Sequence, residues 1–110
     1  MVQRMGRVIG IDPDSINRYK ELHKNPWPDI AEKLKERNIQ NFSIFLREPE
    51  NLLFSYWEYV GDDFERDFDR TRNDPGTQAW WELTAPLQRP LDSRKDGEWW
   101  AMMEPVFYQP

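Results

Sequence analysis

The sequence predicts a single α+β domain that spans residues 1–110, and three observations support this fold class. The chain has the length of one compact domain, at 110 residues. Its six Trp, four Tyr and six Phe make up 15% of the residues and supply apolar area for a core, although 32% of the chain is charged. Runs of alternating polarity are interspersed with stretches in which apolar residues recur at helical spacing, a pattern typical of a sheet packed against helices.

The first third of the chain predicts a strand and two helices. Residues 5–11 alternate and are rich in β-branched side chains, which favours a strand. Asp12-Pro13 is a helix start, with Asp as the N-cap and Pro at the first helical position, and Asn25-Pro26 repeats that signal. The apolar stripes of the two helices are Ile16, Tyr19, Leu22 and His23, followed by Trp27, Ile30, Ala31 and Leu34.

The rest of the chain predicts a hairpin, two more helices and a closing strand. Residues 39–46 and 52–60 are rich in aromatic and β-branched side chains and are separated by a short polar segment, as in a hairpin. Either Asp62 or Asp63 is expected to cap the next helix, and a third Asx–Pro start precedes the helix that contains Trp80 and Trp81. Residues 105–108 are expected to form the closing strand.

In this order the elements give the split βαβ, ferredoxin-like arrangement, a four-stranded antiparallel sheet with helices on one face. The other face of such a sheet must also be covered, because its strands carry many aromatic residues. We therefore expect a second subunit to cover it, giving a homodimer of the dimeric α/β barrel type.

Composition excludes several classes of function. Fifteen Lys and Arg against twenty Asp and Glu give a net charge of −5 without a basic cluster, so nucleic acid is not an expected partner. The absence of Cys excludes disulfides, thiolate catalysis and Cys-ligated metal centres. No apolar run approaches the roughly 18 residues that span a bilayer, and the N-terminus lacks the apolar stretch of a signal peptide. A cytoplasmic protein without membrane contact is expected.

The acidic residues that follow the hairpin are interpreted as a solvated helix face rather than a metal site. Arg66 and Arg70 lie three or four residues from several of them, which is the spacing of surface ion pairs on a helix. No spacing of metal ligands is recognisable, so no metal is expected. The acidic residues concerned are Asp62, Asp63, Glu65, Asp67 and Asp69.

Tyr19 and His23 are the candidate catalytic residues. Four residues apart, they share one face of a continuous helix. An imidazole with a pKa near 6.5 exchanges protons at neutral pH, and a phenol can hydrogen-bond a hydroxyl, so the pair suits acid–base chemistry on a polyol. A helix-boundary Tyr and His that merely keep their polar ends in water would show the same spacing.

Trp80 and Trp81 are the candidate binding residues. Neighbouring helical residues point about 100° apart, so one indole can enter the core while the other lines a pocket. Indoles offer a flat apolar surface and one N–H donor, which suits the C–H face and hydroxyl rim of a sugar. Packing of both indoles in the core is the alternative.

These residues, in this order, resemble the L-rhamnose mutarotase family over nearly the whole chain. The resemblance implies a dimeric ferredoxin-like fold with a sugar pocket in each subunit. It also implies a cofactor-free reaction that interconverts the α and β anomers of L-rhamnose or a related 6-deoxy sugar such as L-fucose. The motifs that carry it are Asp12-Pro13, Tyr19-x-x-x-His23, Pro26-Trp27-Pro28, residues 41–46, residues 51–54, Trp80-Trp81 and Val106-Phe107-Tyr108.

Carried over position by position, the resemblance assigns roles to the candidate residues. His23 matches the family's proton donor, Tyr19 a tyrosine that contacts the substrate, and Trp80 and Trp81 the tryptophan pair at the sugar. Phe42 departs from the family, which commonly has a tyrosine that reaches the substrate there. The segment 89–101 is also less like the bacterial members.

Two other functions fit the same residues. A cofactor-independent oxygenase of the same dimeric fold would also have an aromatic site with one His or Tyr. A non-catalytic sugar-binding module would hold a monosaccharide on its tryptophans without changing the rate of anomer exchange.

Overall fold

The computed structural model describes residues 2–110, so Met1, the first residue of the expected domain, lies outside the described residues. Two short 3-10 turns, at Pro13–Ser15 and Ala85–Leu87, supplement the helices and strands. The elements are β1 (Gln3–Ile11), α1 (Ile16–Lys24), α2 (Pro28–Glu36), β2 (Ile39–Arg47), β3 (Leu52–Tyr59), α3 (Phe64–Arg72), α4 (Pro75–Thr84), β4 (Gln88–Arg89) and β5 (Ala101–Met103).

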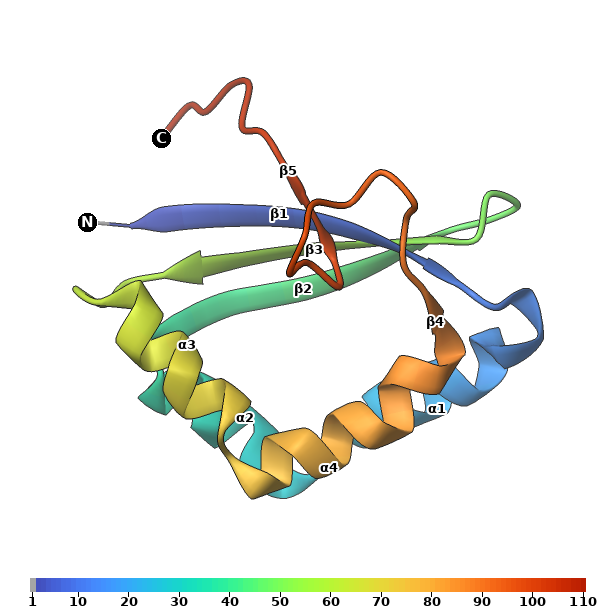
Figure 1. Ribbon diagram of the computed structural model, residues 1–110, viewed down its shortest axis with the longest axis horizontal. Helices are drawn as coiled ribbons and strands as arrows, with labels where there is room; N and C mark the ends of the chain where they lie inside the picture. Colours follow the sequence, from blue (N-terminus) through green and yellow to red (C-terminus); the bar gives the residue numbers. More distant parts are fainter. Residues whose placement is uncertain (1) are drawn as a thin grey trace.

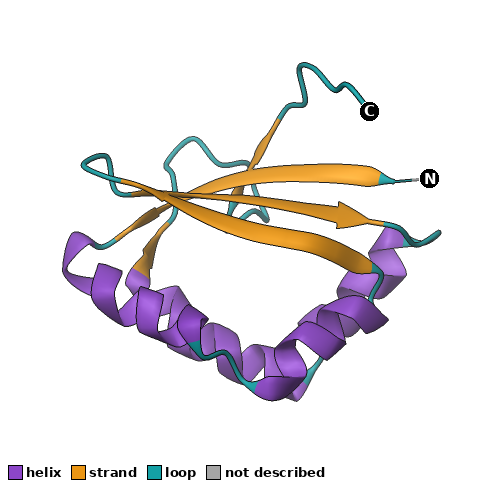
Figure 2. Ribbon diagram, turned by 180° about the vertical axis from the view of Figure 1, so that it is seen from behind, coloured by secondary structure: helices purple, strands orange, loops and turns teal. Residues whose placement is uncertain are grey.

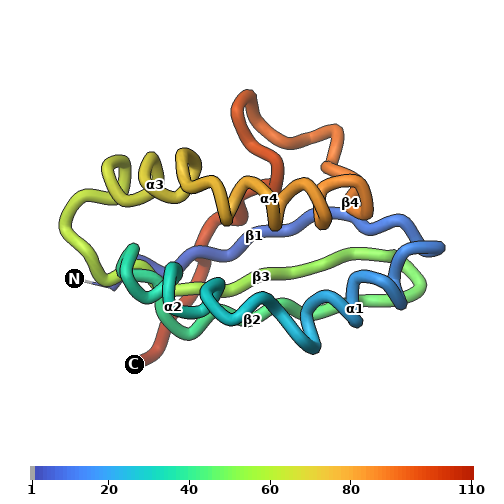
Figure 3. The backbone as a smooth tube through the Cα atoms, turned by 90° about the horizontal axis from the view of Figure 1, so that it is seen from below, coloured from blue at the N-terminus to red at the C-terminus, as the bar shows by residue number. Residues whose placement is uncertain are grey.

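The strands form one antiparallel sheet, and the helices all lie on one of its sides (Figures 1 and 2). The sheet order is β2-β3-β1-β4, and β5 pairs with β1 beside β4. Seen from the helix side, α1 and α2 form one row and α3 and α4 a second row (Figure 3). The predicted antiparallel sheet with helices on one face is confirmed. Within residues 2–110, no helix has the length and apolar character needed to cross a membrane.

Alternation along β3 decides which side chains meet the helices. Leu53, Ser55, Trp57 and Tyr59 are buried, whereas the residues between them are only half-buried on the opposite face. A period of two is what a strand produces when one face packs against helices. The main core lies at one end of this face and consists of Ile9, Ile11, Ile16, Tyr19 and Leu53.

Carboxylate caps begin α3 and α4 where the sequence predicts helix starts. The side chain of Asp63 accepts a hydrogen bond from the Arg66 backbone N–H at 3.1 Å, and that of Asp74 accepts one from the Thr77 N–H at 2.8 Å. Asp12 caps the 3-10 turn that leads into α1. These caps satisfy backbone donors that would otherwise lack partners at a helix start.

The second helix begins later than predicted. Its first residue is Pro28 rather than a residue at Asn25-Pro26. Trp27 is extended, with ψ of 139°, because the ring of the following proline disfavours helical backbone in the preceding residue. The rigid Trp27-Pro28 pair therefore sets the boundary between α1 and α2.

The prediction of a closing strand at residues 105–108 is wrong. The last strand is β5, which ends at Met103 opposite Gly6, and it shares the edge of β1 with β4, so the sheet has five strands rather than four. Pro105 has no N–H to donate to β1, which stops the ladder. The tail beyond it is irregular, and Val106 is 93% exposed.

Asp67 corrects the prediction of a fully solvated acidic face. It is only 2% exposed, and its Oδ2 accepts hydrogen bonds from the Tyr59 hydroxyl at 2.5 Å and from the Asn38 side-chain amide at 3.0 Å. The other four acidic residues of that stretch are exposed. Asp67 differs because its position on α3 points toward β3, where two donors bind its Oδ2, while its Oδ1 lies 3.5–3.6 Å from the guanidinium groups of Arg66 and Arg70.

Candidate active site

Helix α1 carries the two candidate catalytic side chains on one face. Tyr19 is buried and His23 is half-buried. Their rings stack, with centroids 4.2 Å apart and planes inclined by 24°. The four-residue spacing read from the sequence therefore brings the phenol and the imidazole into direct contact.

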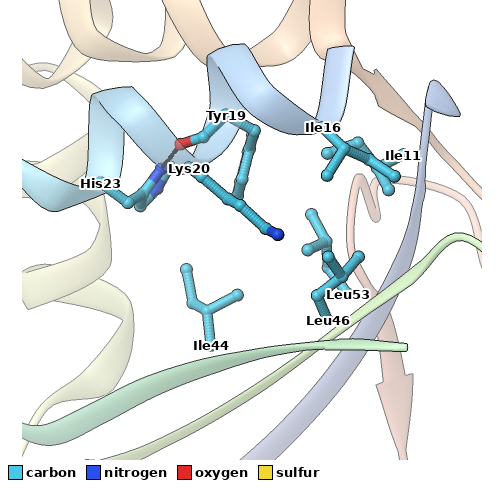
Figure 4. A pocket seen from close by; sticks show the side chains of 8 residues that line it. All are labelled: Ile11, Ile16, Tyr19, Lys20, His23, Ile44, Leu46 and Leu53. Atoms are coloured by element: carbon cyan, nitrogen blue, oxygen red, sulfur yellow. Dashed lines mark hydrogen bonds between the residues drawn. The ribbon is translucent and has the colours of Figure 1, made fainter. Parts of the chain in front are cut away.

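The two rings border a cavity of about 130 Å³ between α1 and the sheet (Figure 4). Its walls are mostly aliphatic, and the Lys20 amine extends toward the space between α1 and the strands. Polar groups in such surroundings interact more strongly than they do in water. The lining residues are Ile11, Ile16, Tyr19, Lys20, His23, Ile44, Leu46 and Leu53.

The hydrogen bond of His23 fixes which ring nitrogen is free. Its Nδ1 lies 2.9 Å from the backbone carbonyl oxygen of Tyr19. A carbonyl oxygen only accepts, so Nδ1 carries a hydrogen and, in the neutral ring, Nε2 is left as an unprotonated base. Burial lowers the pKa of His23 below 6.5, although this hydrogen bond opposes the shift. At neutral pH His23 is therefore mainly a base at Nε2.

Tyr19 has the opposite character. Burial raises the pKa of its hydroxyl to about 12, so the phenol keeps its proton across the physiological range. Its Oη accepts a hydrogen bond from the Gln88 side-chain amide at 3.4 Å. The site thus holds a proton acceptor, on His23, beside a hydroxyl that retains its proton, on Tyr19.

An indole from α4 completes this cluster. Trp80 is buried and meets the His23 ring edge-on, with centroids 5.5 Å apart. Trp27 also packs edge-on against Trp80, with centroids 5.3 Å apart. The imidazole is therefore held between Tyr19 and Trp80, which restricts its orientation.

The structure does not bring every candidate residue to this cavity. Trp81 is 40% exposed and is absent from the residues that line the cavity. Phe42 is 42% exposed and stacks on Trp57, with centroids 6.3 Å apart. Tyr19 and His23 thus line the cavity, Trp80 adjoins it through its contact with His23, and Trp81 and Phe42 lie outside the lining.

Sequence reasoning missed Lys20 and Gln88. Lys20 lies four residues after Ile16 and three before His23, so helical geometry places it on the cavity side of α1. Gln88 reaches Tyr19 because β4 pairs with β1, with Gln88 opposite Ile11. No local pattern signals that contact. In the part of the chain that the structure describes, no group of three or more His, Asp or Glu side chains is placed to hold a metal ion.

Comparison with known proteins gives consistent results. The family model described as L-rhamnose mutarotase matches residues 4–109. The L-rhamnose mutarotase of Pectobacterium atrosepticum is 31% identical over 106 residues, which cover 96% of each chain. That of Bacillus subtilis (strain 168) is 32% identical over 88 residues, covering 80% of this chain and 82% of the relative. The crystal structure of an L-rhamnose mutarotase from Formosa agariphila superposes with a TM-score of 0.78 at 24% identity and covers 98% of this chain and 99% of its own.

Proposed function

The chain belongs to the L-rhamnose mutarotase family, and from this premise we propose that His23 and Tyr19 open and close the sugar ring in the cavity beneath α1. The protein is an isomerase that interconverts the α and β anomers of L-rhamnose. The oxygenase and the non-catalytic binding module are not favoured, because both the family model and the similar proteins are mutarotases.

Ring opening needs a proton acceptor and a proton donor. In the proposed reaction, Nε2 of neutral His23 takes the proton of the anomeric hydroxyl as the bond between C1 and the ring oxygen breaks. His23 returns a proton when the ring closes, and in that step it is the proton donor that the family resemblance implies. The Tyr19 hydroxyl gives its proton to the ring oxygen as the open-chain aldehyde forms, which leaves a Tyr19 phenolate beside the His23 imidazolium until the ring closes. Rotation about C1–C2 exposes the other face of the carbonyl, and closure with the same proton transfers reversed gives the other anomer.

The observation that carries this proposal is the hydrogen bond from His23 Nδ1 to the Tyr19 carbonyl oxygen. It leaves Nε2 as the nitrogen that can reach a substrate, and burial keeps that nitrogen unprotonated at neutral pH. General acid–base catalysis of this kind contributes about 10²–10⁴ in rate.

Trp80 and Trp81 belong to the proposed site on different grounds. Trp80 contacts His23 and so supports the orientation of the imidazole. The place of Trp81 at the sugar rests on the family resemblance, and its partly exposed indole leaves a flat surface for a C–H face of the ring.

The proposal extends to the assembly. The strand order β2-β3-β1-β4 with helices on one side supports a ferredoxin-like arrangement. The sheet face opposite the helices includes Phe45, which is 62% exposed, and the tail on that side of the sheet leaves Val106 exposed (Figure 1). A homodimer packed through this face would bury both. A sedimentation mass of one chain would contradict the homodimer. The cytoplasmic location stays a prediction.

Exchange NMR on equilibrated L-rhamnose tests the catalytic assignment. Cross-peaks between the α and β H1 signals should strengthen with added protein. In His23→Asn the exchange rate should fall at least about a hundredfold, because the base is lost. Lys24→Asn, a change at the neighbouring exposed residue, is the matched control and should leave the rate unchanged. Retention of most of the rate by His23→Asn would show that another group is the base.

A further inference from the structure

The Gln88 side chain connects the Tyr19 hydroxyl to a second indole. Trp99, in the loop before β5, donates from Nε1 to Gln88 Oε1 at 2.7 Å. The other end of the same amide, Nε2, donates to Tyr19 Oη at 3.4 Å. The backbone of Gln88 is itself fixed, because β4 pairs with β1 at that residue.

The direction of these hydrogen bonds follows from the chemistry of the groups. An indole nitrogen donates and cannot accept, so the atom of the amide that faces Trp99 must be the oxygen. The amide nitrogen then faces Tyr19, and an NH₂ group only donates. The Tyr19 oxygen is therefore the acceptor, and its own hydrogen is left to point away from Gln88.

We propose that Gln88 and Trp99 are positioning residues that hold the Tyr19 hydroxyl as a donor toward the substrate. The inference rests on the proposed role of Tyr19 in ring opening. Each bond of the chain runs in one direction, from the Trp99 N–H through the Gln88 amide to the Tyr19 hydroxyl and then to a sugar oxygen. Hydrogen bonds aligned in this way polarise one another, which makes the last donor stronger.

The hydrogen bond from Trp99 is needed because the Gln88 side-chain amide could otherwise rotate. Without the indole N–H, the Gln88 amide is free to rotate by half a turn and present its oxygen to Tyr19. The Tyr19 hydroxyl would then donate to Gln88, and its hydrogen would be lost to the sugar. The separation of 3.4 Å between Gln88 Nε2 and Tyr19 Oη is long for an N–H···O bond, so the shorter bond from Trp99, at 2.7 Å, decides the orientation of the amide.

Two substitutions test the direction of these hydrogen bonds. One reverses the bond between Gln88 and Tyr19, and the other removes the Trp99 bond that orients the amide. Gln88→Glu replaces the donor by a carboxylate, which only accepts and so draws the Tyr19 hydrogen toward itself. Trp99→Phe keeps an aromatic ring at a partly exposed position but removes the N–H. We expect kcat for anomer exchange to fall about tenfold in Gln88→Glu and severalfold in Trp99→Phe, with KM within about twofold, since the lost donor acts mainly on the reacting ring oxygen.

Gln3→Glu is the matched control for the added charge, because Gln3 is exposed at the start of β1. It should leave kcat and KM unchanged. If Gln88→Glu does not fold, Trp99→Phe alone decides the proposal, since it alters only a loop side chain. Wild-type kcat in Trp99→Phe and in any folded Gln88→Glu protein would overturn it.

A double-mutant cycle with Tyr19→Phe separates this inference from the proposed function. If Gln88 acts through Tyr19, Gln88→Glu should cause no further loss in kcat once the Tyr19 hydroxyl has been removed. An equal loss in both backgrounds would overturn the inference and leave the role of Tyr19 intact. Full activity of Tyr19→Phe on its own would overturn the role of Tyr19 and the inference with it.

Discussion

Two buried tyrosines, Tyr19 on α1 and Tyr59 at the end of β3 that precedes α3, use their hydroxyls in opposite ways. Helices α1 and α3 lie toward opposite ends of the sheet (Figure 1). Tyr59, at the end of β3, donates to the Asp67 carboxylate at 2.5 Å and accepts from the Asp63 backbone N–H at 3.1 Å. Tyr19, on α1, accepts from the Gln88 amide at 3.4 Å. The Tyr59 hydroxyl is thus fully used inside the protein, whereas Tyr19 retains a hydrogen that it can donate.

The difference comes from the partner and not from the tyrosine. A carboxylate only accepts, so it takes the phenol hydrogen and closes the arrangement as a structural link between β3 and α3. An amide NH₂ donates, so it leaves the phenol hydrogen available for a ligand. The same residue type therefore stabilises one end of the molecule and is available for chemistry at the other.

Removing one hydroxyl at a time is the strongest test of this comparison. Tyr19→Phe should lower the anomer exchange rate about a hundredfold with little change in melting temperature, because it removes the proposed donor. Tyr59→Phe should do the reverse and lower Tm by several degrees while the folded protein keeps its rate. Exchange NMR and thermal unfolding monitored by circular dichroism measure the two effects. Loss of activity without loss of stability in Tyr59→Phe would contradict a structural role for Tyr59 and a catalytic role for Tyr19 alone.

Asp67 provides the next largest effect. Asp67→Ala leaves the Tyr59 hydroxyl and the Asn38 amide without their buried acceptor, which should cost about 2–3 kcal/mol of the free energy of unfolding. Asp69→Ala is the control, because Asp69 is an exposed residue of the same helix and should cost less than about 0.5 kcal/mol. Urea unfolding measures both values. Equal costs for the two variants would show that the Asp67 carboxylate is not a structural link.

The two ends of the molecule should also respond to pH in separate ranges. The exchange rate should fall about tenfold per pH unit below the pKa of His23, which burial holds under 6.5, because protonation removes the base. It should not fall again at moderately alkaline pH, since the pKa of Tyr19 is about 12.

The protein should stay folded over the acidic pH range in which its exchange rate falls. Hydrogen bonds from Tyr59 and Asn38 hold the pKa of Asp67 below 3.8, so its contribution is complete above about pH 4 and is lost as the pH falls further. Rates and Tm measured between pH 4.5 and 8 test the separation. An acid limb centred above pH 6.5, or one that coincides with unfolding, would contradict it.

Phe42 should give the smallest effect. Its ring packs on Trp57 and does not line the cavity, so Phe42→Tyr should change the exchange rates of L-rhamnose and L-fucose by less than about twofold. Phe42→Leu serves as the control for loss of the ring stack. A large and selective gain with one sugar in Phe42→Tyr would show that the substrate reaches this part of the sheet.

The sequence predicted the features whose signals are local. The caps at Asp63 and Asp74 and the two strands of the hairpin, β2 and β3, follow from neighbouring residues, as does the shared face of Tyr19 and His23.

What could not be predicted depends on contacts between distant residues. The sequence predicts a solvated Asp67 because the residues that bind it lie on other elements, and Gln88 meets Tyr19 across 69 residues of chain. The sequence predicts the closing strand at residues 105–108 instead of at β5, since pattern alone does not weigh the missing N–H of Pro105 against the apolar residues that follow it.

Trp80 meets His23 edge-on, with ring centroids 5.5 Å apart, so the fluorescence of this indole can report on the imidazole. A charged imidazole quenches the emission of an indole that it touches more strongly than a neutral imidazole does. The fluorescence of Trp80 should therefore follow the charge of His23 in the absence of any sugar. The protonation state on which the reaction depends becomes observable in the resting enzyme, by spectroscopy rather than by kinetics.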